Sequence, residues 1–280
     1  MGYKKPANVT EMDLCNAPLP THKDTYTVIP HSLIINQTNT LLEKFKLRVK
    51  SKVYKCNANA KVAQGIYYLE PQNVGLQKID NELGLMFAWT NSYDKSVRFQ
   101  CGIGAYVFVC NNGMIHGDMA TYSRKHTGTA DIEAKMQLQA QIQNASKHFN
   151  QLLRDRDLFR SYKLSSKEQA ELLGRLYAEE EILDISQVVI AKKEMDKPSY
   201  NYNCDLENAW TFYNNITHAL KTSHPRNWMS DQQEFHKFMT SELLSNVQLH
   251  ISDNPNQLSI PVEDTIEEAS NMLYGVDNIQ

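Results

Sequence analysis

The segment Ala105-Tyr106-Val107-Phe108-Val109-Cys110-Asn111-Asn112-Gly113-Met114-Ile115 carries the clearest fold signal in the sequence. The apolar and aromatic residues from Val97 to Val109 are typical of a β-strand. Asn111-Asn112-Gly113 then predicts a tight turn, because Asn and Gly tolerate positive φ. Residues 114–116 are therefore expected to return as the antiparallel partner of this strand.

Three segments upstream of this hairpin also predict strands. They span residues 44–53, 61–70 and 83–90, and the last two are rich in the aliphatic and aromatic side chains that suit a sheet. Together with the hairpin they predict an antiparallel β-rich region over residues 26–128. Residues 1–25 contain several prolines and little periodicity, which indicates an irregular N-terminal arm.

Beyond Gly128 the apolar residues recur every three or four positions, which is the period of a helix. A stripe from Leu138 to Leu152 predicts one helix, and the capping box Ser165-x-x-Glu168 predicts the start of another. We expect a helical region over residues 129–250, followed by an acidic C-terminal tail over residues 251–280. The sequence thus predicts an α+β fold, with an N-terminal antiparallel β-rich half packed against a C-terminal helical half.

Charge is unevenly distributed along the chain. The 280 residues contain 29 Lys+Arg and 32 Asp+Glu, so the formal net charge is only −3. Residues 41–65, however, contain seven cationic residues and one acidic residue, whereas seven acidic residues and no cationic ones follow Lys237. The balanced total therefore does not exclude an anionic partner for the first segment. The acidic tail is expected to be solvated, to fold back on the basic segment, or to dock on a host or phage protein.

The cationic residues of residues 44–53 alternate with apolar ones, which is the period of a strand. We interpret the segment as an amphipathic strand with a cationic outer face and an apolar inner face. Such a face suits the phosphates of a nucleic acid, and nearby tyrosines suit stacking with unpaired bases. The candidate nucleic-acid-binding residues are Lys44, Lys46, Arg48, Lys50, Lys52, Lys55, Tyr54, Tyr67 and Tyr68. The alternative interpretation is an exposed edge strand whose lysines prevent aggregation.

No established catalytic or cofactor-binding motif occurs in the sequence, so we expect no cofactor. Four residues of metal-ligating types lie close together, but their spacing matches no established ligand pattern. They are Cys110, His116, Asp118 and His126. We expect no metal site, and a metal-dependent enzyme is the weaker alternative. The absence of a C-x-x-C pair favours free thiols. The absence of a long apolar run or a signal pattern predicts a cytoplasmic protein without a membrane partner.

Four segments resemble those of a known protein family. Residues 90–96 are similar to its Asn-Ser-His-Asp-Gly-Ser stretch, and residues 107–115 to the Phe-Arg-Leu-Val-Cys-x-Asn-Gly strand and turn that follow. Residues 124–128 resemble its Arg-His-Ser/Thr-Gly motif, and residues 209–217 its Trp-x-x-x-Asn-x-x-Thr helix. Tyr93 and Lys95 stand where the family usually has His and Gly. The residues that match its motifs are Asn91, Ser92, Asp94, Cys110, Asn112, Gly113, Arg124, His126, Trp210 and Asn214.

Together these segments resemble the phage/plasmid-like proteins grouped as domain of unknown function 932, over roughly residues 85–240. A related group, domain of unknown function 3871, is similar around residues 144–148 and 171–175. The resemblance implies a phage or mobile-element origin, expression in a bacterial cytoplasm, and a neighbourhood of DNA replication and recombination genes.

We therefore expect a non-enzymatic protein of phage or mobile-element DNA metabolism. It would bind or anneal nucleic acid, above all single-stranded DNA, through the basic strand, and whether it does so as a homo-oligomer stays open. The alternative is a protein-interaction or host-modulating factor that acts through the acidic tail or a helical face.

Overall fold

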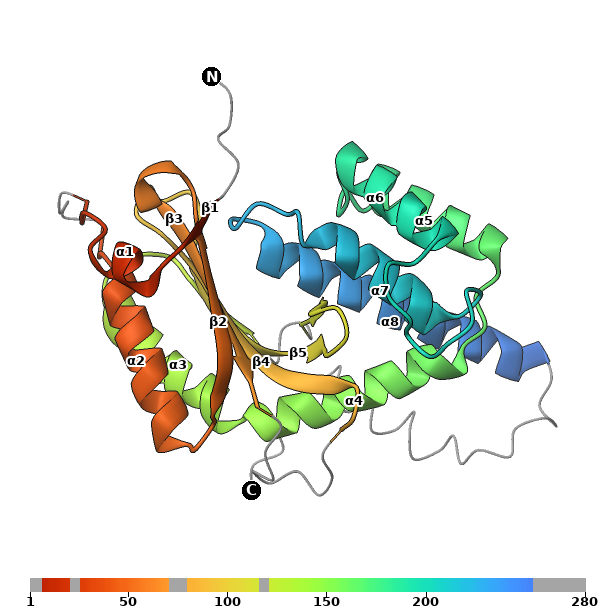
Figure 1. The fold of residues 1–280 in the computed structure, drawn as a ribbon, viewed down its shortest axis with the longest axis horizontal. Helices are drawn as coiled ribbons and strands as arrows, with labels where there is room; N and C mark the ends of the chain where they lie inside the picture. The colour runs from red at the N-terminus through yellow and green to blue at the C-terminus, as the bar shows by residue number, and fades with distance from the viewer. Residues whose placement is uncertain (1–6, 21–25, 71–79, 116–120, 254–280) are drawn as a thin grey trace. The chain divides into compact units, whose positions relative to one another are not determined.

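The computed structural model describes residues 7–20, 26–70, 80–115 and 121–253 (Figure 1). The chain divides into two compact units, Met1–Met239 and Thr240–Gln280. The sheet, the helices up to α7 and the first turns of α8 belong to the first unit. Within the described residues, no helix is long and apolar enough to cross a membrane. The acidic tail beyond residue 253 lies outside the described residues.

One antiparallel sheet forms the core of the first unit. The strands follow the order β1-β2-β3-β4-β5-β6. Strands β6 and β7 pair with the same side of β5, β6 near its C-terminal end and β7 near its N-terminal end. The predicted hairpin is confirmed, because Ala105 pairs with Met114 and Tyr106 pairs with Gly113. The strands are β1 (Ala7–Val9), β2 (Val49–Cys56), β3 (Val62–Leu69), β4 (Leu83–Ser92), β5 (Phe99–Val107), β6 (Gly113–Met114) and β7 (Thr121–Arg124).

Helices fill the C-terminal half, which confirms the α+β prediction. The predicted capping box is present, since Ser165 Oγ accepts the backbone N–H of Glu168 while the Glu168 carboxylate accepts the backbone N–H of Ser165. These helices are α3 (Ala130–Gln143), α4 (Ala145–Ser161), α5 (Ser166–Ala178), α6 (Ile185–Asp196), α7 (Ala209–Leu220) and α8 (Trp228–Asp253).

Two helices lie where the sequence pattern predicted none. The expected irregular arm contains β1 and the short helix α1 (Glu11–Cys15), which opens with a capping box between Thr10 and Asp13. Helix α2 (His31–Lys44) ends on the first residue of the expected strand at 44–53, so that strand prediction is wrong at its start. The buried residues of α2 recur with helical spacing. They are His31, Ile34, Ile35, Thr38, Leu41 and Leu42.

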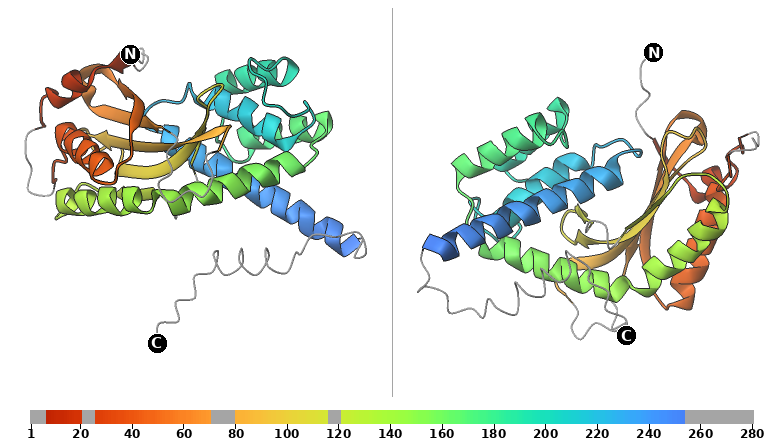
Figure 2. Two further views of the ribbon diagram at one scale, coloured as in Figure 1. Left: turned by 60° about the horizontal axis from the view of Figure 1, so that its bottom comes forward. Right: turned by 180° about the vertical axis from the view of Figure 1, so that it is seen from behind.

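Helices cover the sheet on both sides (Figures 1 and 2). On one side, which we call the α2 face, Asn39 of α2 accepts a hydrogen bond from Lys52 of β2, and His31 contacts Asn91 of β4. On the other side, the α8 face, the start of α8 packs on the sheet. The buried side chains at this contact form one apolar cluster, which comprises Ile66, Met86, Ala88, Tyr106, Ile115, Trp228 and Met229. Because β4 lies between two covered faces, all ten of its residues are buried.

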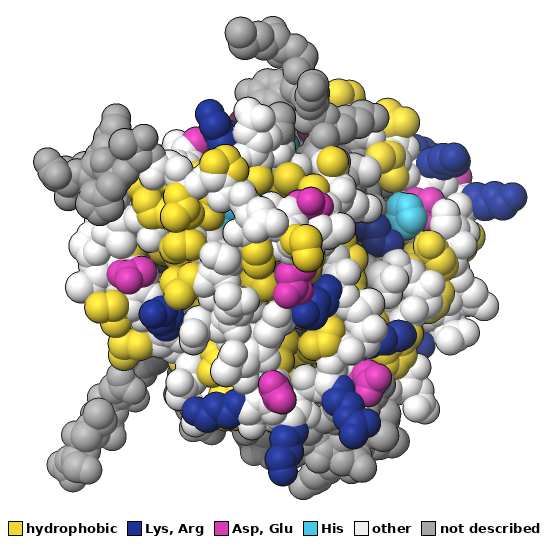
Figure 3. Space-filling view, turned by 60° about the vertical axis from the view of Figure 1, so that its left-hand side comes forward, with side chains coloured by type: hydrophobic (Ala, Val, Ile, Leu, Met, Phe, Trp, Pro, Cys, Tyr) yellow, Lys and Arg dark blue, Asp and Glu magenta, His cyan; other side chains and the backbone are white. Residues whose placement is uncertain are grey.

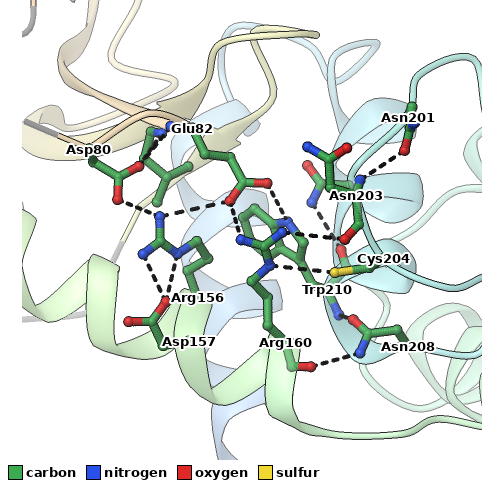
Figure 4. Close-up of polar contacts among 12 residues, drawn as sticks. Asp80, Glu82, Arg156, Asp157, Arg160, Asn201, Asn203, Cys204, Asn208 and Trp210 are labelled. Atoms are coloured by element: carbon green, nitrogen blue, oxygen red, sulfur yellow. Dashed lines mark hydrogen bonds and ion pairs between the residues drawn. The ribbon is translucent and has the colours of Figure 1, made fainter.

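An ionic network joins the start of β4 to α4 and α7 (Figure 4). Arg156 Nη1 lies 2.6 Å from Asp80 Oδ2, and Arg160 Nη1 lies 2.8 Å from Glu82 Oε2. The second oxygen of Glu82 accepts the Trp210 Nε1–H at 3.3 Å. Burial alone would raise the pKa of Asp80, but hydrogen bonds from the backbone and from Arg156 outweigh burial and lower it. The network therefore fixes α4 and α7 against the start of the central strand β4.

Replacing Arg156 by Met should destabilise the protein by about 2–3 kcal/mol, because it leaves the largely buried Asp80 carboxylate without its cation. Urea denaturation measures the change. Lys192→Met is the control, since Lys192 pairs with Asp196 on an exposed surface and such pairs contribute less than about 1 kcal/mol. Equal losses in the two variants would contradict the role given to the network.

Asp231 in the first turn of α8 is a half-buried carboxyl near the start of α6. Burial raises its pKa to about 7, a hydrogen bond from Ser223 opposes this shift, and the charges of Glu234 and Asp184 add to it. The folded state therefore holds this proton more tightly than the unfolded chain does. The contribution of this protonated carboxyl to the free energy of unfolding is fully present below about pH 4 and is lost as the pH rises through about 7.

Replacing Asp231 by Asn should remove this pH dependence. We expect the variant to be more stable than the parent at pH 8, by about 2–4 kcal/mol, with the difference shrinking towards pH 4. Denaturation curves recorded from pH 4 to pH 8 measure the difference. Parallel profiles for the two proteins would show that Asp231 titrates normally in the fold.

Candidate nucleic-acid interface

The predicted cationic row does not lie on one face of one strand. Lys44 is the last residue of α2, and Lys46 turns the chain with a φ of 57°, before β2 begins at Val49. Lys46 and Arg48 are exposed but lie outside the strand. The alternation of cationic and apolar residues over 44–53 therefore spans the end of a helix, a turn and the first part of a strand. The prediction of a single cationic strand face is wrong for its first three members.

A β-bulge divides the cations of β2 between the two faces. Val49 pairs with Leu69 and Ser51 pairs with Tyr68, so the register shifts by one residue between them. Lys50, inside the bulge, lies on the α8 face with its Nζ 5.9 Å from the ring centroid of Tyr106. Lys52 then falls on the α2 face and Lys55 on the α8 face, because side chains alternate along the rest of the strand.

On the α2 face the candidate residues are engaged within the protein. Lys52 Nζ lies 3.0 Å from Glu11 Oε2. Tyr54 is 5% exposed and its hydroxyl lies 2.9 Å from both Glu11 Oε2 and the hydroxyl of Tyr67, which is 0% exposed. The prediction that Tyr54 and Tyr67 stack with bases is therefore wrong, since α1 and α2 cover them. On this side of the molecule cationic and acidic side chains are interspersed (Figure 3).

On the α8 face, by contrast, the cover formed by the described helices ends at β2. Lys50 and Ser51 are exposed, and Val53 and Lys55 are half-buried. Beside them lie the half-buried rings of Tyr68 and Phe108, each packed edge to face on the buried ring of Tyr106. We call these residues the β2 strip; its members are Lys50, Ser51, Val53, Lys55, Tyr68 and Phe108.

Lys55 has an unusual environment within the β2 strip. Burial lowers its pKa, and it makes no hydrogen bond or ion pair with any residue that the structure describes. Nearby Lys221, which follows α7, donates a hydrogen bond to the carbonyl of Cys110. Burial lowers the pKa of Lys221, Cys110 and Glu194 oppose this shift, and the charge of Lys55 reinforces it. Among the residues that the structure describes, the β2 strip therefore contains a cation with no anion to balance it.

Polar side chains continue from Lys55 across the α8 face. Gln64 pairs with Lys55, Thr90 with Gln64, and Gln100 with Thr90. Gln64 is 1% exposed, yet its Nε2 has no hydrogen-bond acceptor among the described residues. Sequence reasoning missed this row. In the sequence, each of these strands has a polar residue among the apolar ones that point to the core. Only the strand register shows that these polar residues lie side by side.

The family-motif residues of β4 and its following turn have structural roles. Asn91 donates a hydrogen bond to the carbonyl of Ile29 at 2.7 Å, Ser92 Oγ donates to the carbonyl of Val97 at 2.8 Å, and Asp94 accepts the backbone N–H of Ser96. His126 is buried and stacks on Tyr26 with ring centroids 5.3 Å apart. These contacts fix the β4–β5 turn and the segment before α2.

A second motif group joins the β5–β6 hairpin to α7. Asn112 Nδ2 donates to the backbone carbonyl of Asn214 at 2.9 Å and lies 3.1 Å from its Oδ1. Gly113 packs closely, because an added Cβ would lie 3.3 Å from the Trp228 ring and the ring would have to shift slightly to admit it. Cys110 is buried beside Lys221, and Trp210 binds Glu82. Arg124 pairs with Phe99 through the backbone, and its side chain is outside the described part of the structure.

Two possible catalytic arrangements receive no support. His116 and Asp118 lie outside the described residues, and among those described no group of three His, Cys, Asp or Glu residues could hold a metal ion. His236 lies 3.0 Å from both Asp155 Oδ2 and the Tyr213 hydroxyl, an arrangement typical of a proton relay. The three residues are buried among α4, α7 and α8, however, so they have no access to a substrate.

Lys95 adopts a φ of 65°, which favours Gly, the residue that the resembling family usually has there. Lys95→Gly should therefore stabilise the protein by about 0.5–1 kcal/mol, as relief of the left-handed strain exceeds the loss of the cation–π contact with Tyr26. Thermal denaturation measures this change. Lys95→Ala keeps the strain and should give no gain; a gain with Ala as large as with Gly would contradict the explanation.

Comparison with known proteins identifies the family. No curated protein and no solved structure matches this chain. A family model described as "Domain of unknown function (DUF932)" matches residues 18–241, a range that includes both motif groups, the β2 strip and Lys221. The chain belongs to the DUF932 family.

Proposed function

We propose that this protein binds single-stranded nucleic acid along the β2 strip, without catalysis. The observation that carries the proposal is the position of Lys50 and Lys55 on one face of β2, beside two half-buried aromatic rings. Cations that follow a backbone and rings that present an apolar surface to bases are the two components of most single-strand binding surfaces. Lys55 adds a specific reason, since it has no counter-charge among the described residues.

The dimensions of the strip suit a short run of nucleotides. Lys55 lies five positions beyond Lys50 along the strand, which corresponds to about 15 Å, so the two ammonium groups would contact different phosphates of one nucleic-acid strand. Tyr68 and Phe108 lie on the same face as these cations. A role in phage or mobile-element DNA metabolism in a bacterial cytoplasm, including strand annealing, is part of the same proposal and rests on the family resemblance.

Fluorescence anisotropy with a labelled dT oligonucleotide tests the proposal. Affinity should fall linearly with salt on logarithmic axes, and the slope should decrease by about 0.7 for each phosphate contact removed. The double variant Lys50→Met/Lys55→Met should therefore bind more weakly and with a slope smaller by about 1.4.

Two lysines outside the strip provide matched controls. Lys52→Met removes a cation from the same strand but from the opposite face, and Lys61→Met removes an exposed cation between β2 and β3. Both variants should keep the parental slope. Absence of binding by the parent, or an equal effect of Lys61→Met, would refute the assignment to the β2 strip.

A further inference from the structure

We propose that Lys55, Gln64 and Lys221 bind one phosphate group, supplied by a nucleic-acid backbone or by free phosphate. The backbone form of this proposal rests on the proposed function, whereas the free-phosphate form does not. The three residues come from three elements, β2, β3 and the end of α7.

The first argument is that the three side chains provide donors without sufficient acceptors. Lys55 and Gln64 are register partners on one face, which places their Cβ atoms about 5 Å apart. Lys55 Nζ has no acceptor among the described residues, and neither has Gln64 Nε2. Lys221 has three N–H donors, of which the structure shows one used, on the carbonyl of Cys110. A buried donor without an acceptor costs free energy that a ligand oxygen would recover.

The second argument is charge. Burial lowers the pKa of both lysines, and the charge of Lys55 lowers the pKa of Lys221 further. The acid near Lys221 is Glu194, and it already accepts the backbone N–H and the hydroxyl of Ser199 at 2.8 and 2.6 Å. An anion between the lysines would supply the missing negative charge. The charged oxygens of a phosphate group accept hydrogen bonds from several donors at once, and bonds from lysine ammonium groups to them are among the stronger ones in proteins.

Thermal denaturation in sodium phosphate, compared with sodium chloride of equal ionic strength, provides the first test. The parent protein should have a higher Tm in phosphate, because a ligand that binds the folded state stabilises it. Lys55→Met should have a higher Tm than the parent in chloride, since it removes an unpaired half-buried charge. Neither Lys55→Met nor Lys221→Met should show the rise in Tm that phosphate gives the parent protein.

Titration calorimetry with inorganic phosphate provides the second measurement. Loss of one charged donor should weaken binding about tenfold or more. Gln64→Leu should weaken it less, because it removes a neutral donor. Lys52→Met, on the opposite face of the same strand, is the control and should keep the parental affinity. If Lys55→Met does not fold, Lys55→Gln and Lys221→Met provide the same comparison.

A dT oligonucleotide without terminal phosphates, titrated into the same variants, distinguishes the source of the phosphate group. If Lys55→Met and Lys221→Met weaken the binding of both inorganic phosphate and the oligonucleotide, the site accepts a phosphate group from either source. Weakened binding of the oligonucleotide alone assigns the site to a nucleic-acid backbone. Binding of inorganic phosphate alone supports the site while the proposed nucleic-acid function fails. If neither ligand is weakened by Lys55→Met or Lys221→Met, the proposal is overturned.

Discussion

Burial of β4 on both faces is the constraint on which the rest of the first unit depends. Every residue from Leu83 to Ser92 is buried, including three polar ones at its end, so both faces of the sheet need a cover of helices. Helices α1, α2 and α3 cover one face, and the start of α8 covers the other. The second cover is narrower and ends at β2. The β2 strip is therefore partly exposed to solvent because of how the core is built.

The ionic network at the start of β4 sets the position of this narrower cover. Glu82 binds Arg160 of α4 and Trp210 of α7, and the chain leaving α7 provides Lys221 and then the start of α8. The Asn112–Asn214 contact holds the β5–β6 hairpin against the same helix. The motif residues Trp210, Asn112 and Asn214 thus position the elements around the candidate site and are themselves buried. They maintain the fold and are distinct from the residues proposed to bind a ligand.

Local signals predicted the parts of the fold that local chemistry controls. The Asn-Asn-Gly turn produced the β5–β6 hairpin, and the Ser165 capping box opened α5. Helix α2 escaped prediction because Pro30 caps it without a side-chain hydrogen bond and its end continues into a strand-like alternation. The bulge at Lys50 escaped because one inserted residue moves side chains to the opposite face without changing the composition. The pairing of Lys55 with Gln64 depends on register, which no single segment specifies.

Lysine-reactivity footprinting by mass spectrometry tests the central claim, that the α8 face of β2 is the binding face, most directly. The full chain is acetylated at low reagent concentration with and without a dT oligonucleotide, and the reactivity of each lysine is compared. We expect the oligonucleotide to protect Lys50, Lys55 and Lys221 while Lys52 and Lys61 keep their reactivity. Protection of Lys52 or Lys61 with no change at Lys50 and Lys55 would contradict the claim.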